Sequence, residues 1–158
     1  MKILLKVTVI ALLISCQTNK QMKSADSGSS SQDKSLVISM KKTMCYGKCP
    51  VYEIEIYDDL TVLFSGEKNV DLIGVYTASI DDSTYDSLVK KFNDANFFTF
   101  QKEYKKAVSD LPTTYLFFSD GAKSMKVKDY YGAPDSLKAL ENSVADLIPE
   151  LEWSRSNE

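Results

Sequence analysis

Two cysteines four positions apart, Cys45 and Cys49, are the residues of this chain best suited to chemistry. They lie in the stretch CYGKCP at residues 45–50. Paired thiols can form a structural disulfide, exchange electrons as a redox pair or bind a soft metal ion. The spacing is longer than the C-x-x-C of thioredoxin-type sites, and Pro50 leads into a predicted strand. We therefore expect no helix N-terminus that would lower the pKa of either thiol.

Three uses of this cysteine pair remain open from the residues alone. A disulfide is favoured outside the cytoplasm, and Gly47 would ease the tight turn of so small a ring. Thiol-redox exchange is the second use. Binding of Cu(I) is the third, because C-x-x-x-C-P resembles the copper motif of Sco-type assembly proteins, although those proteins also use a histidine. We predict a Cys45–Cys49 disulfide, with thiol-redox or Cu(I) handling as the alternative function.

Other catalytic chemistry is restricted because the chain contains no histidine. A Ser-His-Asp triad, a Cys-His pair and a His-bearing zinc site are therefore excluded. The acidic pairs at 58–59 and 81–82 fall where turns and helix caps favour Asp. Asp110 and Asp129 flank a predicted hairpin and form a candidate polar site, although hydrogen bonding to a loop is the simpler interpretation. We predict no catalytic residue, no metal ion and no cofactor.

Charge and aromatic content limit the expected partners. The formal net charge is −3 over 158 residues, with no basic excess, so nucleic acid is not an expected partner. Tyr57 lies on the polar side of a predicted strand, and Tyr130 and Tyr131 follow another. These three tyrosines form a candidate contact patch for a partner.

The N-terminal segment indicates export and anchoring rather than fold. Residues 1–15 carry two lysines followed by an apolar run that is too short to span a bilayer, which needs about 20 apolar residues. LISC at residues 13–16 resembles the lipobox of bacterial lipoproteins, which implies a signal peptide cleaved before Cys16 and acylation of that residue, palmitate included. The alternatives are an ordinary signal peptide or an uncleaved anchor. Residues 16–34 are predicted to be the lipidated cysteine and a disordered tether, because they contain few apolar side chains.

Residues 35–150 are predicted to form a single α+β domain, followed by a C-terminal tail at 151–158. Strict alternation in VYEIEIY is typical of a half-buried strand, and similar patterns recur along the chain. Strands are predicted at 36–41, 51–57, 61–66, 73–80, 113–119 and 122–130. Apolar residues at helical spacing predict helices over 85–92 and 134–148. We expect a mainly antiparallel sheet of about six strands with two helices packed on one face.

The motif around the cysteines resembles a known family of unknown function found among bacterial envelope lipoproteins. The matching residues of its C-x-G-x-C-P-x-Y hallmark are Cys45, Gly47, Cys49, Pro50 and Tyr52. The resemblance continues through Gly66 to KDYYGAP before the last predicted helix, and it spans about residues 35–148. Leu60 departs from the pattern, because the family tends to have Gly in that turn. The resemblance implies these domain boundaries and brings no established activity.

Together these features predict a membrane-anchored envelope lipoprotein with a binding or scaffolding domain that is not catalytic. Its expected partners are the membrane, through the N-terminal lipid, and an envelope protein or glycan. The expected location is the bacterial cell envelope, at the outer membrane and facing the periplasm or the cell surface.

Replacement of the predicted lipid acceptor tests the anchoring. We expect Cys16→Ala to release the protein from the membrane fraction or to leave it as unprocessed precursor, because no acyl chain can then be attached. Membrane fractionation and metabolic labelling with a fatty acid measure this. A variant that fractionates and labels like the parent protein would contradict the lipobox interpretation.

Overall fold

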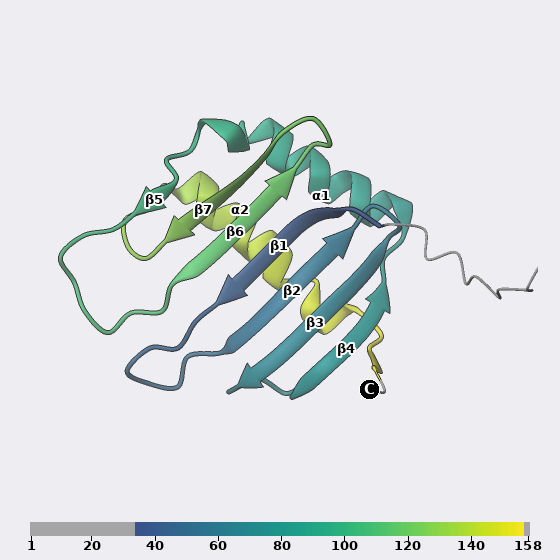
Figure 1. Ribbon diagram of the computed structural model, residues 1–158, viewed down its shortest axis with the longest axis horizontal. Coiled ribbons are helices and arrows are strands. Elements are labelled where there is room, and N and C mark those ends of the chain that lie inside the picture. The colour runs from purple at the N-terminus through teal and green to yellow at the C-terminus, as the bar shows by residue number, and fades with distance from the viewer. Residues whose placement is uncertain (1–33, 157–158) are drawn as a thin grey trace, which may run out of the picture. The chain divides into compact units, whose positions relative to one another are not determined.

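The computed structural model describes residues 34–156 (Figure 1). The predicted signal peptide, Cys16 and nearly all of the predicted tether lie outside these residues. Within them, no helix is long and apolar enough to cross a membrane.

A single sheet of eight strands forms the centre of the domain, in the spatial order β5-β7-β6-β1-β2-β3-β4-β8. The strands are β1 (Leu36–Lys42), β2 (Val51–Tyr57), β3 (Thr61–Lys68), β4 (Gly74–Ser79), β5 (Glu103–Tyr104), β6 (Thr114–Ser119), β7 (Ser124–Asp129) and β8 (Ser154–Arg155). Neighbouring strands are antiparallel except β5 and β7, which are parallel, so the sheet is mixed.

The predicted number of about six strands is too low. The two additional strands, β5 and β8, have two residues each and lie at the two edges of the sheet. Two residues cannot show an alternating pattern, so periodicity could not reveal them. β8 lies in the segment set apart above as a tail, where Ser154 pairs with Thr77 of β4.

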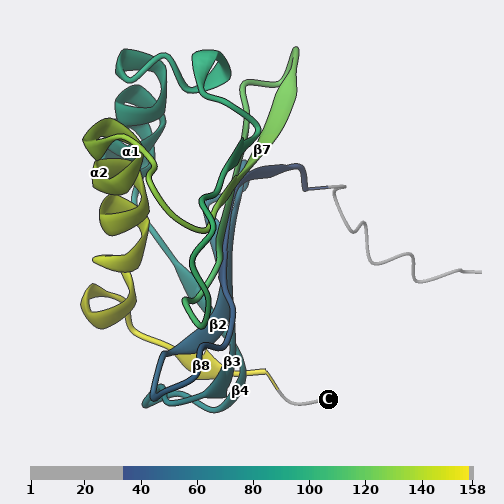
Figure 2. The same ribbon diagram turned by 90° about the vertical axis from the view of Figure 1, so that its left-hand side faces the viewer.

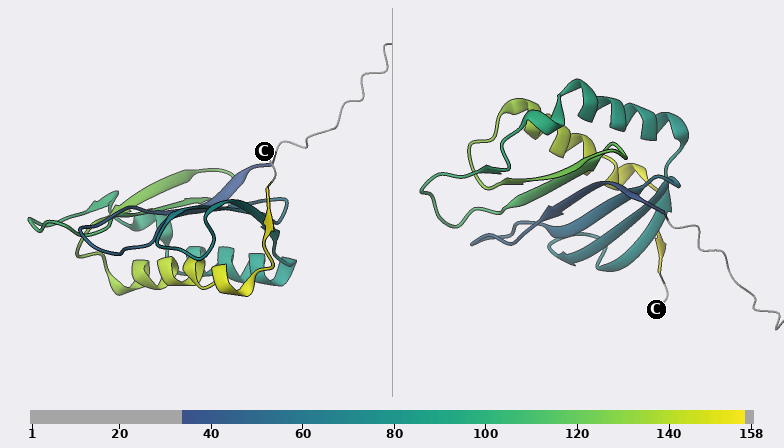
Figure 3. Two further views of the ribbon diagram at one scale, coloured as in Figure 1. Left: turned by 90° about the horizontal axis from the view of Figure 1, so that it is seen from below. Right: turned by 45° about the horizontal axis from the view of Figure 1, so that its top comes forward.

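Two helices, α1 (Asp82–Asp94) and α2 (Asp135–Ala145), cover one face of the sheet and leave the other open (Figure 2). Two short 3-10 turns follow them, η1 (Phe97–Thr99) and η2 (Ile148–Glu150). The views in Figure 3 place both helices along the same side of the sheet. The side chain of Asp81 caps α1, since its Oδ1 accepts a hydrogen bond of 2.9 Å from the Thr84 amide. The predicted α+β class is confirmed.

The core lies between the sheet and the helices and follows the strand alternation. Ile54 and Ile56 of β2 are fully buried on the helix side, whereas Glu53 and Glu55 point to the open face. Around Phe118 on β6, the rings of three more phenylalanines pack with centroids 4.9–5.8 Å apart. These three are Phe92, Phe97 and Phe98. Such offset aromatic contacts stabilise the core beyond the area they bury.

One row of paired residues crosses six strands near their ends. The row runs through Asp129, Thr114, Lys42, Tyr52, Gly66 and Gly74. Four loops lie beyond this row, at 43–50, 69–73, 105–113 and 130–134. We call these loops, with the strand ends that carry them, the disulfide end. The chain enters β1 from Ser35 at the opposite end of the sheet.

Gly66 permits the loop before β4 to turn back closely on β3. A Cβ atom at Gly66 would lie 1.8 Å from the carbonyl oxygen of Leu72, and this oxygen belongs to the backbone. The loop begins at Asn69 in the left-handed conformation, with φ of 54°. Gly47 was expected to supply conformational freedom in the cysteine ring, but its φ is not in the left-handed region. The steric requirement for glycine therefore lies at Gly66.

Alanine substitutions at these two glycines test this assignment. We expect Gly66→Ala to lower the free energy of unfolding by about 2 kcal/mol or more, because the backbone of the loop must move away. Gly47→Ala is the matched control, since its Cβ would meet only Cys45 Sγ at an ordinary 3.7 Å. Urea denaturation measures both. Equal losses for the two variants would contradict the close return of the loop.

Candidate functional site

Cys45 and Cys49 form a disulfide, as predicted, with their Cα atoms 5.8 Å apart. The ring that it closes projects from the sheet between β1 and β2. Inside and beside the ring, Tyr46 is 91% exposed and Met44 is 68% exposed. The bond thus holds two large apolar side chains in water on a constrained turn.

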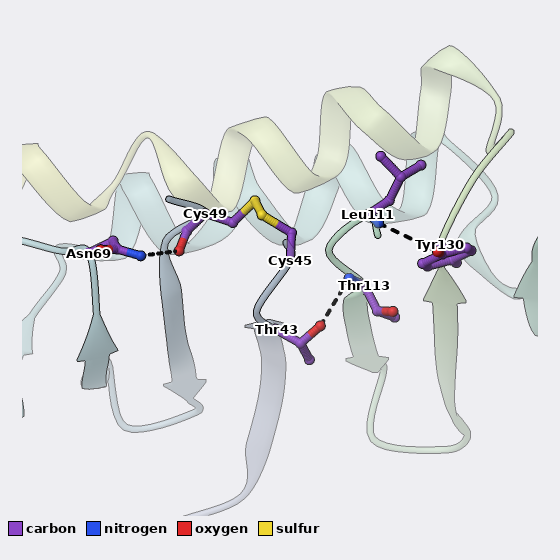
Figure 4. The surroundings of a disulfide bond; sticks show 7 residues. All are labelled: Thr43, Cys45, Cys49, Asn69, Leu111, Thr113 and Tyr130. Atoms are coloured by element: carbon purple, nitrogen blue, oxygen red, sulfur yellow. Dashed lines mark hydrogen bonds between the residues drawn. A yellow bond between two sulfur atoms is a disulfide. The ribbon is translucent and has the colours of Figure 1, made fainter. Parts of the chain in front are cut away.

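Hydrogen bonds connect the ring to the loops on both sides of it (Figure 4). The Asn69 side-chain amide donates to the Cys49 carbonyl over 2.9 Å. On the other side, the Thr43 amide donates to the Thr113 carbonyl, and the Thr113 amide donates to Thr43 Oγ1, both over 3.0 Å. The ring therefore positions the loop at 69–73 and the loop at 105–113 relative to each other.

The loop at 105–113 is also held by Tyr130. Its hydroxyl donates to the Val108 carbonyl over 3.0 Å and accepts from the Leu111 amide over 3.4 Å. The Tyr46 amide of the cysteine ring donates to the Asp110 carbonyl over 3.3 Å. Tyr130 is thus a structural residue that orders this loop through the two hydrogen bonds of its hydroxyl.

The structure gives the two predicted polar-site residues separate roles. Asp110 is exposed in the loop, has a left-handed φ of 68° and accepts a hydrogen bond of 3.0 Å from Ser109 Oγ. Asp129 ends β7 and is only 2% exposed, where it forms an ion pair with Lys138 of α2. Each carboxylate therefore has its own contacts.

The three tyrosines of the predicted contact patch do not come together. Tyr57 lies at the opposite end of the sheet, paired with Leu36, and Lys34 Nζ lies 4.0 Å from the centre of its ring. Tyr130 and Tyr131 follow β7 at the disulfide end. Tyr131 is 44% exposed, so it alone of this pair presents a large apolar surface.

The disulfide end instead gathers the exposed apolar side chains of the domain. Among the residues that the structure describes, all seven large hydrophobic side chains that are exposed lie there. They are Met44, Tyr46, Ile73, Val75, Val108, Leu111 and Tyr131. Tyr131 had been predicted as part of a contact patch, and the other six were missed. Five of those six lie in loops, which have no periodicity, and Val75 lies in β4. The available signal was the presence of apolar residues inside otherwise polar loops.

A buried charged cluster lies next to this end, between β7 and α2. Lys138 contacts Asp129 and also donates to Glu141 Oε2 over 3.2 Å. Glu141 is 4% exposed. Among residues 34–156, neither Asp129 oxygen nor Glu141 Oε1 has a hydrogen-bond partner, although Asp129 Oδ2 is ion-paired with Lys138. Sequence reasoning missed Glu141, although it follows Leu137 by four positions on the apolar stripe of the helix.

Two carboxyl groups that share one ammonium favour a proton on one of them. Burial, together with the neighbouring Asp129, raises the pKa of Glu141 to about 7, although Lys138 opposes this. Burial alone would lower the pKa of Lys138, but its two carboxyl partners raise it. Tyr52 lies beside this cluster, and burial followed by the Glu141 charge raises its pKa to about 12.

Removal of the disulfide should weaken the fold without abolishing it. For the double variant Cys45→Ser, Cys49→Ser we expect a loss of about 2 kcal/mol in the free energy of unfolding, since the closed ring is short. Denaturant unfolding measures this, with the exposed ring residue Lys48→Ser as control. Unchanged stability would show that the hydrogen bonds to Asn69 and Thr113 suffice to hold the loops.

The raised pKa of Glu141 predicts a pH-dependent stability. The folded state binds this proton more tightly than the unfolded chain does, so the contribution is complete below pH 4.5 and is lost as pH rises through 7. We expect Glu141→Gln to remove up to about 3 kcal/mol of this pH dependence and to be more stable than the parent at pH 8. Melting curves from pH 5 to 8 measure it, with exposed Glu150→Gln as control. A slope that persists in Glu141→Gln would assign the titration to another group.

Comparison with known proteins agrees with the boundaries of the fold. A search of the curated proteins finds no match to this chain. The family model described as a domain of unknown function, DUF6438, matches residues 36–148. This range contains both helices, strands β1 to β7 and the cysteine ring. The chain therefore belongs to the DUF6438 family.

Proposed function

We propose that this protein is a lipoprotein of the bacterial cell envelope whose folded domain binds another envelope component and does not catalyse a reaction. The lipobox-like LISC at residues 13–16 supports the anchoring. The observation that carries the binding role is the gathering of exposed apolar side chains on the loops of the disulfide end. Large exposed apolar surface on a soluble domain marks an interaction site.

The position of this surface suits a protein held by its N-terminus. The chain enters β1 at one end of the sheet, and β1 runs from there to the cysteine ring at the other. Seven residues of strand rise about 3.3 Å each, so the two ends are separated by about 23 Å. With the lipid at Cys16, the disulfide end would point away from the attachment and be free to meet a protein or glycan.

Position-specific photocrosslinking in the intact envelope tests this surface. We expect discrete higher-mass adducts when the crosslinking residue replaces Tyr46 or Leu111, because both side chains lie on the proposed surface. Tyr57 and Asp120, at the opposite end, are the matched controls. Adducts from the control positions alone, or from none of the four, would contradict binding through the disulfide end.

Of the alternative functions, Cu(I) handling requires free thiolates at Cys45 and Cys49, and a thiol-redox role requires that their disulfide be easily reduced. In the structure the two sulfur atoms are bonded to each other. An intact mass of the protein isolated from the envelope without reductant separates the two functions. A two-proton deficit that survives mild reductant favours the binding role, and free thiols or retained copper would favour the alternative.

A further inference from the structure

An apolar cavity of about 410 Å³ lies between the sheet and the C-terminal segment. Its lining includes Tyr52, Phe64, Val70, Asp71, Leu72 and Trp153. The volume is within the range of about 300–1,000 Å³ that is usual for small-molecule sites. Three parts of the chain build it: strands β2 and β3, the loop at 69–73 and the segment after α2.

One wall is a fixed series of aromatic rings. The ring centroids of Tyr52 and Phe64 are 5.4 Å apart, and those of Phe64 and Trp153 are 5.5 Å apart. Trp153 Nε1 donates to the Ile148 carbonyl over 2.8 Å, which fixes the indole in place. These contacts form the wall before any ligand arrives, so binding would cost little side-chain ordering.

Another part of the lining comes from Val70 and Leu72, and two independent contacts hold their loop. Gly66 allows the Leu72 carbonyl to approach β3 closely. The Asn69 side chain donates to the Cys49 carbonyl, which ties the same loop to the disulfide ring. This wall is therefore held by a close backbone approach and by a side-chain hydrogen bond to the disulfide ring.

The polar groups of the cavity define what could occupy it. Asp71 is the only charged residue of the lining, and no Lys or Arg takes part. A carboxylate at the rim repels an anionic head group and attracts a cationic one. The apolar walls favour a hydrocarbon or aromatic body.

We infer that this cavity binds a small apolar molecule whose polar end is neutral or positively charged. The apolar body would lie against Phe64 and Trp153, and the polar end would lie near Asp71. This inference rests on the proposed function only in treating the domain as a binding module. It requires neither the anchor nor the partner at the exposed loops.

Trp153 is the only tryptophan of the chain, so its fluorescence reports on this cavity alone. The purified full-length protein is titrated with three ligands of equal chain length: 1-octanol, octylamine and octanoate. We expect saturable changes in Trp153 emission with the alcohol and the amine, and apparent binding of octanoate that is weaker by about ten-fold because Asp71 repels it. Titration of free tryptophan with the same ligands corrects for effects on the fluorophore that do not involve the cavity.

Charge reversal at the rim and filling of the cavity complete the test. Asp71→Lys should reverse the order of affinity for octylamine and octanoate, whereas Asp86→Lys, an exposed site on α1, should leave that order unchanged.

Val70→Phe should weaken binding of all three ligands by about ten-fold or more, since the added ring occupies the cavity, and its melting curve verifies folding. Emission that changes linearly with ligand, or an order that Asp71→Lys does not alter, would overturn the inference. That outcome would not change the photocrosslinks at Tyr46 and Leu111. Failure of ligand binding in the cavity can therefore be distinguished from failure of partner binding at the disulfide end.

Discussion

The Cys45–Cys49 disulfide is the constraint on which the arrangement of this end of the domain depends. A ring closed between β1 and β2 has little freedom, and its backbone supplies hydrogen-bonding groups on both sides. Asn69 uses the Cys49 carbonyl, and the Asp110 carbonyl accepts from the amide of Tyr46. Two loops that are far apart in the sequence are thereby fixed against one covalent element. Loops ordered in this way can keep apolar side chains exposed, because the hydrogen bonds prevent the collapse that would bury them.

Tyr52 connects the exposed end with the interior. Its ring packs on Phe64 at the wall of the cavity, and burial, followed by the charge of Glu141 on α2, raises the pKa of its hydroxyl. Helix α2 is held to strand β7 by Lys138, which contacts one buried acid from β7 and one from its own helix. Two acids with one ammonium leave a charge imbalance that is relieved by a proton. Tyr52 thus contributes to core packing and to the cavity wall, and it lies beside the cluster of Asp129, Lys138 and Glu141.

The elements with strong periodicity were predictable from sequence, whereas the features that shape the site were not. The alternation of VYEIEIY predicted β2 and its buried face, and the count of cysteines supported the disulfide. β8 was missed because two residues carry no pattern, and it was found only through its pairing with β4. Gly47 was given a conformational role because a turn is visible in sequence, whereas the close approach of the Leu72 carbonyl to Gly66 depends on tertiary structure. Burial of Asp129 likewise required knowledge of where α2 lies.

The two ends of the sheet differ in their exposed side chains. Those around the start of β1 are polar, and those at the disulfide end are apolar. Residues such as Ser35, Asp58 and Asp59 surround the point where the chain enters β1, and they are satisfied by local hydrogen bonds. The disulfide end instead exposes side chains whose burial would be favourable by about 25 cal/mol per Å² of apolar surface. Contact with another molecule would bury this surface and release that free energy, which supports the binding role that we propose.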